Sequence, residues 1–391
     1  MINELLTELR CLGDIGQTAA GGSNRVAYTE PFYKGRDYVQ KIMQQLGLDT
    51  RVDRIGNLFG TTKSGTGPKI LLGSHLDTVP NGGIYDGALG VLAGIECVRR
   101  LNAERYRLQH PIQIVGFVEE EGNAVGGTFG SRCMCGQEIG EKEKIDMARV
   151  HLTMDDVAGS MCDPDDFLCY LEMHIEQGGI LESEGACIGA VEGIVAIIRF
   201  YATVNGQSNH AGSTPMWLRK DAMLNSCNII RRLMQLVMEY DTSMVCTVGE
   251  FSIPNGAVNV IPGKTEFLIE MRYKNIDGMI SVIQQLREEF PEPILQLRQF
   301  LNQDATKMDA RLVAAVEDIC KKSGVLCKRM YSGAGHDAIN TARIMPAGLF
   351  FIPSRDGISH SPQEYSSPDS IEQGINVLVE LVKSIDSGRV L

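Results

Sequence analysis

Residues 69–101 read "KILLGSHLDTVPNGGIYDGALGVLAGIECVRRL". The apolar run up to about His75 predicts a short buried strand, and the part from Gly87 onward predicts a helix. The glycine-rich loop between them carries Asp77 and Asp86. A strand that leads through a loop into a helix is the repeating unit of α/β proteins, so this stretch favours that fold class. A polar surface turn is the plainer interpretation of the loop, and the rest of the chain has to decide between the two.

Strand and helix patterns alternate from about residue 51 to residue 187. Residues 112–122 ("IQIVGFVEEEG") predict a second strand that ends in three glutamates, and residues 167–178 ("FLCYLEMHIEQG") predict a third that ends near His174. Repeated alternation of this kind predicts an α/β domain with a mixed, mostly parallel sheet and helices on both faces.

The pattern changes character near Gly193. Residues 197–307 show strands and helices in the order βαββαβ, which is the ferredoxin-like α+β arrangement. Its first helix is expected to begin with Ser213 or Thr214 as N-cap. Residues 308–391 then return to the α/β pattern, with "GLFFIPS" at 348–354 as a short strand. We therefore expect a discontinuous domain of residues 1–196 and 308–391, interrupted by an inserted domain of residues 197–307.

Composition and charge exclude several classes of function. The 391 residues are 43% hydrophobic and 22% charged, and the net charge is −12. This charge disfavours nucleic acid and anionic membranes as partners, because both require a basic surface. No run of 18 apolar residues is present, and the N-terminal residues predict an amphipathic helix rather than a signal peptide. The eleven cysteines show no paired metal-binding spacing, so we expect reduced thiols and a cytoplasmic location.

Five potential metal ligands fall at or beyond the ends of the predicted strands. Ligands bind open α/β sheets outside the carboxyl ends of the strands, so these side chains should converge. Imidazole and carboxylate ligands without thiolate suit Zn²⁺, Mn²⁺, Co²⁺ or Ni²⁺. Any single histidine is more often an ordinary surface or core residue, and three adjacent glutamates are more often a solvated face. Taken together, the set is too large for one catalytic ion and fits two ions if one carboxylate bridges them. The candidates are His75, Asp86, Glu121, His174 and His360.

The motifs that carry these residues resemble those of one enzyme family. In chain order they are "GSHLDTV", "DGALG", "EEEG", "HIEQG", "NHAGSTP", "NVIPG", "SGAGHDA" and "DGISHSP". The set is similar to that of the N-carbamoyl-L-amino-acid hydrolases, the bacterial-type β-ureidopropionases and the allantoate amidohydrolases. These belong to a larger clan of di-metal aminoacylases and carboxypeptidases. The resemblance spans nearly the whole chain, and "HIEQG" and "NHAGSTP" are its most specific parts.

The resemblance implies a role for each residue of the metal site. It implies two divalent ions per subunit, bridged by Asp86, with Glu120 as the general base for the attacking water. The carboxylate of Asp77 would hold the imidazole of His75 and fix its tautomer. A histidine at position 174 is the pattern of the ureido hydrolases, where peptidase members usually carry a carboxylate. The implied ligands are His75, Asp86 and His174 for the first ion, and Asp86, Glu121 and His360 for the second.

The resemblance also implies substrate contacts and a homodimer. The inserted domain would act as a lid and dimerisation domain. Arg272 would clamp the carboxylate of a small ureido acid, although its strand pattern also fits a solvent-facing pair with Glu270. Asn259 would bind the substrate and His210 would stabilise the oxyanion, both reaching the site of a partner subunit. Gln177 and the Gly335–His336 segment would line the pocket.

The implied reaction is hydrolysis of the carbamoyl group of N-carbamoyl-L-amino acids to the amino acid, CO₂ and ammonia. The alternative reaction is hydrolysis of allantoate to ureidoglycine. More distant alternatives are a dipeptidase or aminoacylase activity, or a non-catalytic binding protein on the same fold. One departure stands out. Relatives commonly continue the acidic motif with Gly-Ser-Arg-Phe, whereas this chain reads Gly122-Asn123-Ala124. The departure puts the packing beneath the site in question, together with the fine substrate preference.

Overall fold

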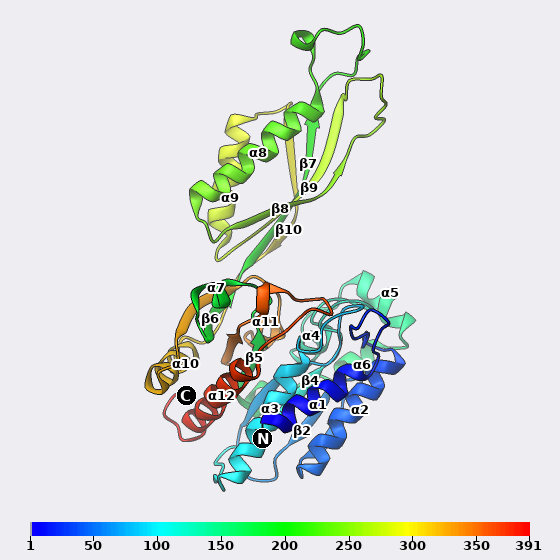
Figure 1. Ribbon diagram of the computed structural model, residues 1–391. Helices are drawn as coiled ribbons and strands as arrows, with labels where there is room; N and C mark the ends of the chain where they lie inside the picture. Colours follow the sequence, from blue (N-terminus) through cyan, green and yellow to red (C-terminus); the bar gives the residue numbers. More distant parts are fainter. Residues whose placement is uncertain (1) are drawn as a thin grey trace. The chain divides into compact units, whose positions relative to one another are not determined.

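The computed structural model describes residues 2–391, and they divide into two compact units (Figure 1). The first unit comprises the chain up to Glu192 together with Lys307–Leu391, and the second comprises Gly193–Thr306. The first boundary therefore precedes the expected one at residues 196–197. The chain passes from β6 (Ile188–Ile194) into β7 (Ala196–Asn205) across a single residue, so no turn signal marks the boundary in the sequence.

The sheet of the first unit is parallel at its centre and antiparallel at its edges. Its strand order is β1-β2-β4-β3-β5-β13-β6-β11, and β12 pairs with β6. The central strands β4, β3, β5 and β13 are mutually parallel, while β1–β2, β2–β4 and β13–β6 are antiparallel. The expected mixed α/β sheet is confirmed. Because its four central strands are parallel, their carboxyl ends lie along the same edge of the sheet. The strand bounds are β1 Asp49–Val52, β2 Leu58–Thr61, β3 Lys69–His75, β4 Ile112–Phe117, β5 Phe167–Ile175, β11 Thr306–Lys307, β12 Cys327–Ser332 and β13 Ala347–Ile352.

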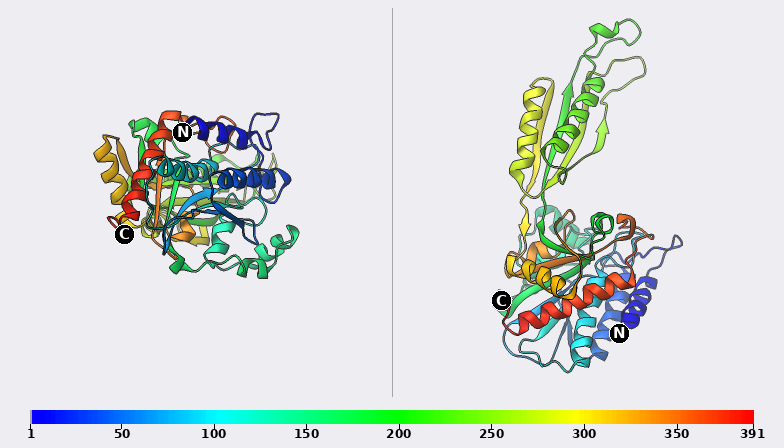
Figure 2. Two further views of the ribbon diagram at one scale, coloured as in Figure 1. Left: turned by 90° about the horizontal axis from the view of Figure 1, so that it is seen from below. Right: turned by 60° about the vertical axis from the view of Figure 1, so that its left-hand side comes forward.

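Helices cover this sheet on both faces, as Figure 2 shows in the view from below. On one face α3 packs on β3, β4 and β5 and is flanked by α1 and α12, while α11 contacts β5 and β13. Because α3 lies between the sheet and other helices, it is apolar on nearly all sides and almost wholly buried. The helix bounds are α1 Ile2–Asp14, α2 Glu30–Gln45, α3 Ala88–Ala103, α4 Phe129–Met134, α5 Glu141–Arg149, α6 Met154–Ala158, α7 Ile180–Glu184, α10 Ala310–Ser323, α11 Ala338–Thr341 and α12 Pro368–Asp386.

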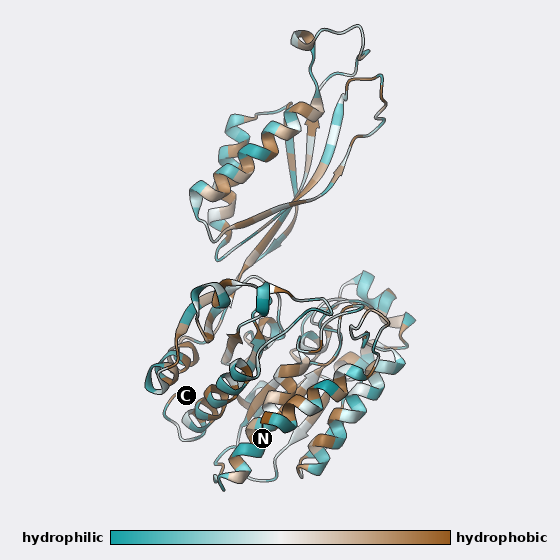
Figure 3. Cartoon of the chain, in the orientation of Figure 1, coloured by the Kyte–Doolittle hydropathy of each residue, from teal (hydrophilic) through white to brown (hydrophobic). Residues whose placement is uncertain are grey.

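The second unit is a four-stranded antiparallel sheet with two helices. Its elements follow the order β7, α8, β8, β9, α9, β10, and its strand order is β10-β7-β9-β8. Residues that alternate along β7 and β9, among them Phe200 and Ile269, pack against apolar residues of the helices, such as Leu233 and Met279. Figure 3 shows the mixture of hydrophobic and hydrophilic residues on α8 and α9 that this packing requires. The bounds are α8 Ala222–Tyr240, β8 Val245–Ser252, β9 Lys264–Tyr273, α9 Ile276–Glu289 and β10 Leu295–Gln303.

The expected start of α8 at Ser213 or Thr214 is wrong. The helix begins at Ala222, and the carboxylate of Asp221 accepts hydrogen bonds from the backbone N–H groups of Met223 (2.9 Å) and Leu224 (3.3 Å). Pro215 instead precedes a short 3₁₀ turn, Met216–Leu218. A carboxylate that caps two N–H groups is a stronger start signal than a proline alone. Among residues 2–391, none of the helices is both long and apolar enough to cross a membrane.

Candidate metal centre

The parallel centre of the first sheet brings the expected ligands together. His75 is the last residue of β3, and His174 is the penultimate residue of β5. Glu120 and Glu121 follow the end of β4, and His360 lies in the loop after β13. Because these four strands are parallel, their carboxyl ends meet at one edge of the sheet.

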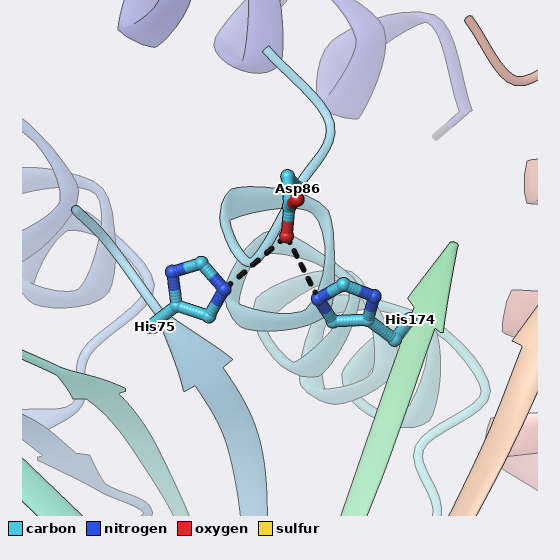
Figure 4. A group of neighbouring side chains, drawn as sticks. All are labelled: His75, Asp86 and His174. Atoms are coloured by element: carbon cyan, nitrogen blue, oxygen red, sulfur yellow. Dashed lines mark ion pairs between the residues drawn. The ribbon is translucent and has the colours of Figure 1, made fainter. Parts of the chain in front are cut away.

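Asp86 stands between the imidazoles of His75 and His174 (Figure 4). Its Oδ1 lies 3.3 Å from Nε2 of His75 and 3.1 Å from Nε2 of His174, and all three side chains are buried. The other ring nitrogen of each histidine donates to a backbone carbonyl, Nδ1 of His75 to Asp77 at 3.0 Å and Nδ1 of His174 to Ile175 at 2.8 Å. In the neutral ring, Nδ1 carries the proton and Nε2 turns its lone pair toward the same carboxylate oxygen, whereas the protonated ring donates a hydrogen bond to that oxygen from Nε2.

A glycine is required directly after Asp86. Gly87 has φ 63°, in the left-handed region, and a Cβ at this position would collide with the ring of His75. This close approach explains part of the glycine-rich pattern in the loop and rules out the surface-turn interpretation.

The other oxygen of Asp86 belongs to a second group of side chains. Its Oδ2 lies 3.3 Å from Nε2 of His360, which is in turn 3.5 Å from Oε2 of Glu121. Gln177 Nε2 donates to the same Oδ2 at 2.8 Å, and the Ser359 hydroxyl lies 3.2 Å from it. His360 is half exposed, whereas Asp86 and Glu121 are largely buried, so this group opens toward solvent on the His360 side.

The three glutamates after β4 have separate environments. The backbone N–H groups of Glu120 and Glu121 donate to the two carboxylate oxygens of Asp77, at 3.1 and 3.2 Å. This arrangement turns the Glu120 side chain toward His75, with Oε2 3.8 Å from Nε2. Asp77 contacts the imidazole of His75 through its backbone carbonyl and not through its carboxylate as expected, since Oδ1 lies 3.7 Å from Nδ1. The carboxylate instead holds the backbone of the acidic run.

Glu119 folds away from the ligands. Its backbone has φ 60°, and its Oε1 accepts hydrogen bonds from the N–H groups of Ala124 (2.5 Å), Val125 (2.6 Å) and Gly126 (3.3 Å). Asn123 contributes a long contact of 3.4 Å to the carbonyl of Thr78. The loop that departs from the usual family motif is therefore closed around a buried carboxylate.

Burial and crowding perturb the acids of this cluster strongly. Burial, with the neighbouring charge of Asp86, raises the pKa of Glu121 to about 7. Burial also raises the pKa of Glu120 well above its usual range, although His75 opposes the shift. Burial alone would raise the pKa of Asp86, but hydrogen bonds from three imidazoles hold it well below its ordinary value. Hydrogen bonding to Asp86 raises the pKa of His360 to about 9 against the effect of burial.

The donor set fits divalent cations. One donor atom from each of His75, Asp86 and His174 lies within 4.8 Å of the others, and the same holds for Asp86, Glu121 and His360. A third group with this spacing consists of Glu172, His174 and His336. Oε1 of Glu121 is buried without a hydrogen-bond partner among the described residues. Buried lone pairs and excess carboxylates are costly unless a cation compensates them, so the first two groups suit divalent ions with nitrogen and oxygen ligands.

His336 lies beside the first group rather than within it. Its ring centroid is 4.5 Å from that of His174, and its Nε2 lies 3.0 Å from the hydroxyl oxygen of Ser332. Burial lowers its pKa well below the ordinary value. Glu172, which sequence reasoning missed, lies beneath His174 and accepts hydrogen bonds from Ser74 (2.7 Å) and the N–H of Ala338. Gly335 precedes His336 directly, as its place in the motif requires.

Three expected substrate contacts belong to the second unit. The Nε of Arg272 donates to Glu270 at 2.8 Å, and Glu270 also accepts from Nε of Arg199 at 2.6 Å. His210 and Asn259 lie on adjacent loops, where the N–H of Ala211 donates to the carbonyl of Asn259 at 2.9 Å. Both His210 and Asn259 are exposed. The strand pattern of β9 is as expected, with Ile269 and its alternate neighbours buried and Arg272 on the other face.

Two further residues contact the candidate ligands, and sequence reasoning missed both. Ser359 lies beside Asp86, and Glu364 accepts hydrogen bonds from the loop that carries Asp86. In the sequence, only their closeness to His360 points to these two residues, because neither stands at a spacing typical of metal ligands.

Comparisons with known proteins identify the family of the chain. A family model described as peptidase family M20/M25/M40 matches residues 71–384. The N-carbamoyl-L-amino acid amidohydrolase of Geobacillus stearothermophilus is 35% identical in an alignment 404 positions long, which covers 97% of each chain. The allantoate amidohydrolase of Bacillus subtilis (strain 168) is 34% identical over 406 residues, again covering 97% of each. The crystal structure of a hydantoinase/carbamoylase family amidase from Burkholderia ambifaria superposes with a TM-score of 0.88 at 31% identity, covering 100% of this chain and 98% of that one. The chain therefore belongs to peptidase family M20/M25/M40 and is a hydrolase of carbon–nitrogen bonds.

Proposed function

We propose that the enzyme hydrolyses the ureido carbon–nitrogen bond of N-carbamoyl-L-amino acids and releases the amino acid, CO₂ and ammonia. One observation carries this proposal. A largely buried carboxylate, that of Glu120, lies beside a cluster of histidines and carboxylates that suits two divalent ions. The full-length relatives named as amidohydrolases support this substrate class over peptides.

The residues around the cluster divide the work of the reaction. When bound, two divalent ions at these ligands polarise the ureido oxygen and lower the pKa of a water molecule. Glu120 accepts a proton from the attacking water and returns it to the nitrogen of the amino acid as the carbon–nitrogen bond breaks. The remaining carbamate decomposes to CO₂ and ammonia. Asp77 keeps Glu120 and His75 in position through hydrogen bonds to the backbone of one and the ring of the other.

Arg272 is proposed to bind the carboxylate of the substrate. Its Nε donates to Oε1 of Glu270 at 2.8 Å, a contact that helps to orient the guanidinium before the substrate binds. Gln177 is proposed to contact the substrate near the ligands, since its Oε1 is buried without a partner among the described residues. Gly335 and His336 would complete the wall of the pocket.

We further propose that the enzyme is a homodimer in which His210 and Asn259 act in the partner's site. Arg272 pairs with Ile197 at one end of the β7–β9 ladder, and Lys264 pairs with Asn205 at the other. The eight steps from Lys264 to Arg272, at about 3.3 Å each, span about 26 Å. His210 lies beyond the Asn205 end, where it bridges to Val260. One small ureido acid cannot contact both ends of this ladder, which supports contributions from two subunits.

Allantoate is the second candidate substrate. It also carries a carboxylate one carbon from a ureido nitrogen, so Arg272 would serve it equally well, and a relative of equal coverage is named for it. A dipeptidase or aminoacylase activity is the remaining alternative within the family.

Ammonia release from a substrate panel tests the proposal. The chelator-treated enzyme would receive Mn²⁺, Zn²⁺, Co²⁺ or Ni²⁺ and then N-carbamoyl-L-amino acids, N-carbamoyl-β-alanine or allantoate. Metal-dependent release from the first group alone is the expected result, and release from allantoate alone would transfer the proposal to that substrate. Silence across the panel, with hydrolysis of dipeptides or acyl-amino acids, would refute the ureido assignment.

A further inference from the structure

Glu364 joins two loops that each carry a candidate metal ligand. It lies four residues after His360 and is 5% exposed. Its Oε1 accepts hydrogen bonds from the backbone N–H groups of Tyr85 (2.9 Å) and Asp86 (3.0 Å). Its Oε2 lies 2.9 Å from the hydroxyl oxygen of Ser359. One carboxylate thus spans the loop before α3 and the loop after β13, and we call this arrangement the Glu364 clasp.

The clasp closes beside the second group of ligands. The hydroxyl oxygen of Ser359, which faces Glu364, also lies 3.2 Å from Oδ2 of Asp86. This Oδ2 atom is in turn 3.3 Å from Nε2 of His360. A hydroxyl has one proton, so Ser359 donates to one carboxylate at a time. The shorter contact is with Glu364. Donation to Glu364 leaves Oδ2 of Asp86 with a lone pair for a cation, beside the hydrogen bond from Gln177.

The loop before α3 is fitted closely to the Glu364 side chain. A Cβ at position 83 would collide with the carboxylate, and the residue there is Gly83. The loop therefore approaches Glu364 with its backbone, which is how the N–H groups of Tyr85 and Asp86 reach one carboxylate oxygen.

The two groups of ligands differ in how firmly the fold holds them. His75 and His174 belong to central strands, whose ladders fix their backbones. Glu121 and His360 lie on loops, and the side chain of His360 is 50% exposed. Ordering loop ligands costs conformational entropy at the moment of binding unless other contacts have already ordered them. The second group therefore depends on supports of the kind that Glu364 provides.

We propose that Glu364 is a positioning residue for the ion held by Asp86, Glu121 and His360. The proposal rests on the two-ion site of the proposed function. Glu364 does not touch the ion; it holds the backbone of Asp86 and the Ser359–His360 segment at the spacing that the ion requires. Outer partners of this kind typically change metal affinity about 10- to 100-fold when removed.

The chain offers a matched control in Asp386. This carboxylate is 1% exposed and, like that of Glu364, accepts backbone N–H groups, from Gln109 (3.0 Å) and His110 (2.8 Å). It lies on α12 and contacts neither ligand loop. Asp386→Ala therefore removes a buried capping carboxylate without touching the clasp.

The test is calorimetric titration of Mn²⁺ into chelator-treated enzyme, with thermal unfolding of the metal-free proteins measured alongside. The wild type should bind two ions per chain. Glu364→Ala should weaken the affinity for one Mn²⁺ ion about 10- to 100-fold and leave the affinity for the other unchanged. Asp386→Ala should lower the melting temperature and leave both affinities unchanged. Glu364→Gln should recover part of the loss, because its carbonyl oxygen can still accept the two N–H groups, while its amide would donate to Ser359 and turn the Ser359 proton toward Asp86.

Several results would overturn the clasp. Unchanged binding in Glu364→Ala, equal weakening in Asp386→Ala, or no recovery in Glu364→Gln would each do so. If Glu364→Ala does not fold without metal, Ser359→Ala tests the same link with both backbone hydrogen bonds intact, and unchanged affinity for the second ion would refute it. Fewer than two ions on the wild type would instead refute the two-ion site itself.

Discussion

Replacing Glu120 by glutamine separates proton transfer from metal binding. The Glu120 carboxylate lies 3.8 Å from Nε2 of His75, and no hydrogen bond involves its side chain among residues 2–391. Glutamine keeps its shape and removes only the proton acceptor. A positioned general base contributes about 10²- to 10⁴-fold, so turnover should fall by that factor. The loss corresponds to about 2.7–5.4 kcal/mol in the activation barrier, at 1.36 kcal/mol for each factor of ten.

The same substitution should not destabilise the metal-free fold. Burial raises the pKa of Glu120, so the folded state disfavours its anion above the ordinary pKa of a glutamate. A neutral side chain removes that cost, and the melting temperature at neutral pH should stay equal or rise.

The assay combines steady-state ammonia release, metal content and thermal unfolding. Glu119→Gln is the matched control, since Glu119 is a buried neighbour whose carboxylate caps the loop at Ala124 and Val125. It should retain far more activity than Glu120→Gln, with any loss appearing in stability. Turnover of Glu120→Gln within a few-fold of wild type, with normal metal content, would remove Glu120 from the proton transfer.

Three further predictions address the ligands and the subunit arrangement. His174→Ala should lower the metal content measured on the dialysed protein, and an unchanged content would rule out His174 as a ligand. Arg272→Lys should mainly raise KM, because an ammonium cannot make the bidentate contact of a guanidinium, and an unmoved KM would place the carboxylate site elsewhere. Inactive Arg272→Ala and His210→Ala enzymes, once mixed and allowed to exchange subunits, should regain activity because each mixed dimer rebuilds one intact site. Activity no higher than that of the parents would refute the contribution in trans.

The convergence of the candidate ligands could be predicted because it follows from strand ends. His75 and His174 close apolar runs that any strand pattern identifies, and parallel strands must end at one edge. The glycine after Asp86 was visible in the sequence, and its reason, the approach of the His75 ring, needed the structure. The βαββαβ order of the second unit was likewise visible in the sequence, since each element has its own period.

Alternation along the strand could not explain the acidic run. In an extended chain neighbouring glutamates would point to opposite sides, but β4 ends at Phe117 and Glu119 has φ 60°. What orients Glu120 is the pair of hydrogen bonds to Asp77, more than forty residues earlier in the chain. Local sequence carries no information about a partner at that separation.

For the same physical reason, His360 can be predicted from the sequence as a candidate ligand, whereas the role of Glu364 cannot. A ligand must be one of a few residue types at the end of an element, so residue type and position together reveal it. A residue that holds a ligand in place needs only an acceptor at the right point in space, and loops from two parts of the chain decide where that point lies. In this enzyme the strands of the sheet orient the first pair of histidines, and side chains such as Asp77 and Glu364 must do the equivalent for ligands on loops. The loop-borne half of the site is therefore where substitutions outside the ligand set should alter metal affinity most.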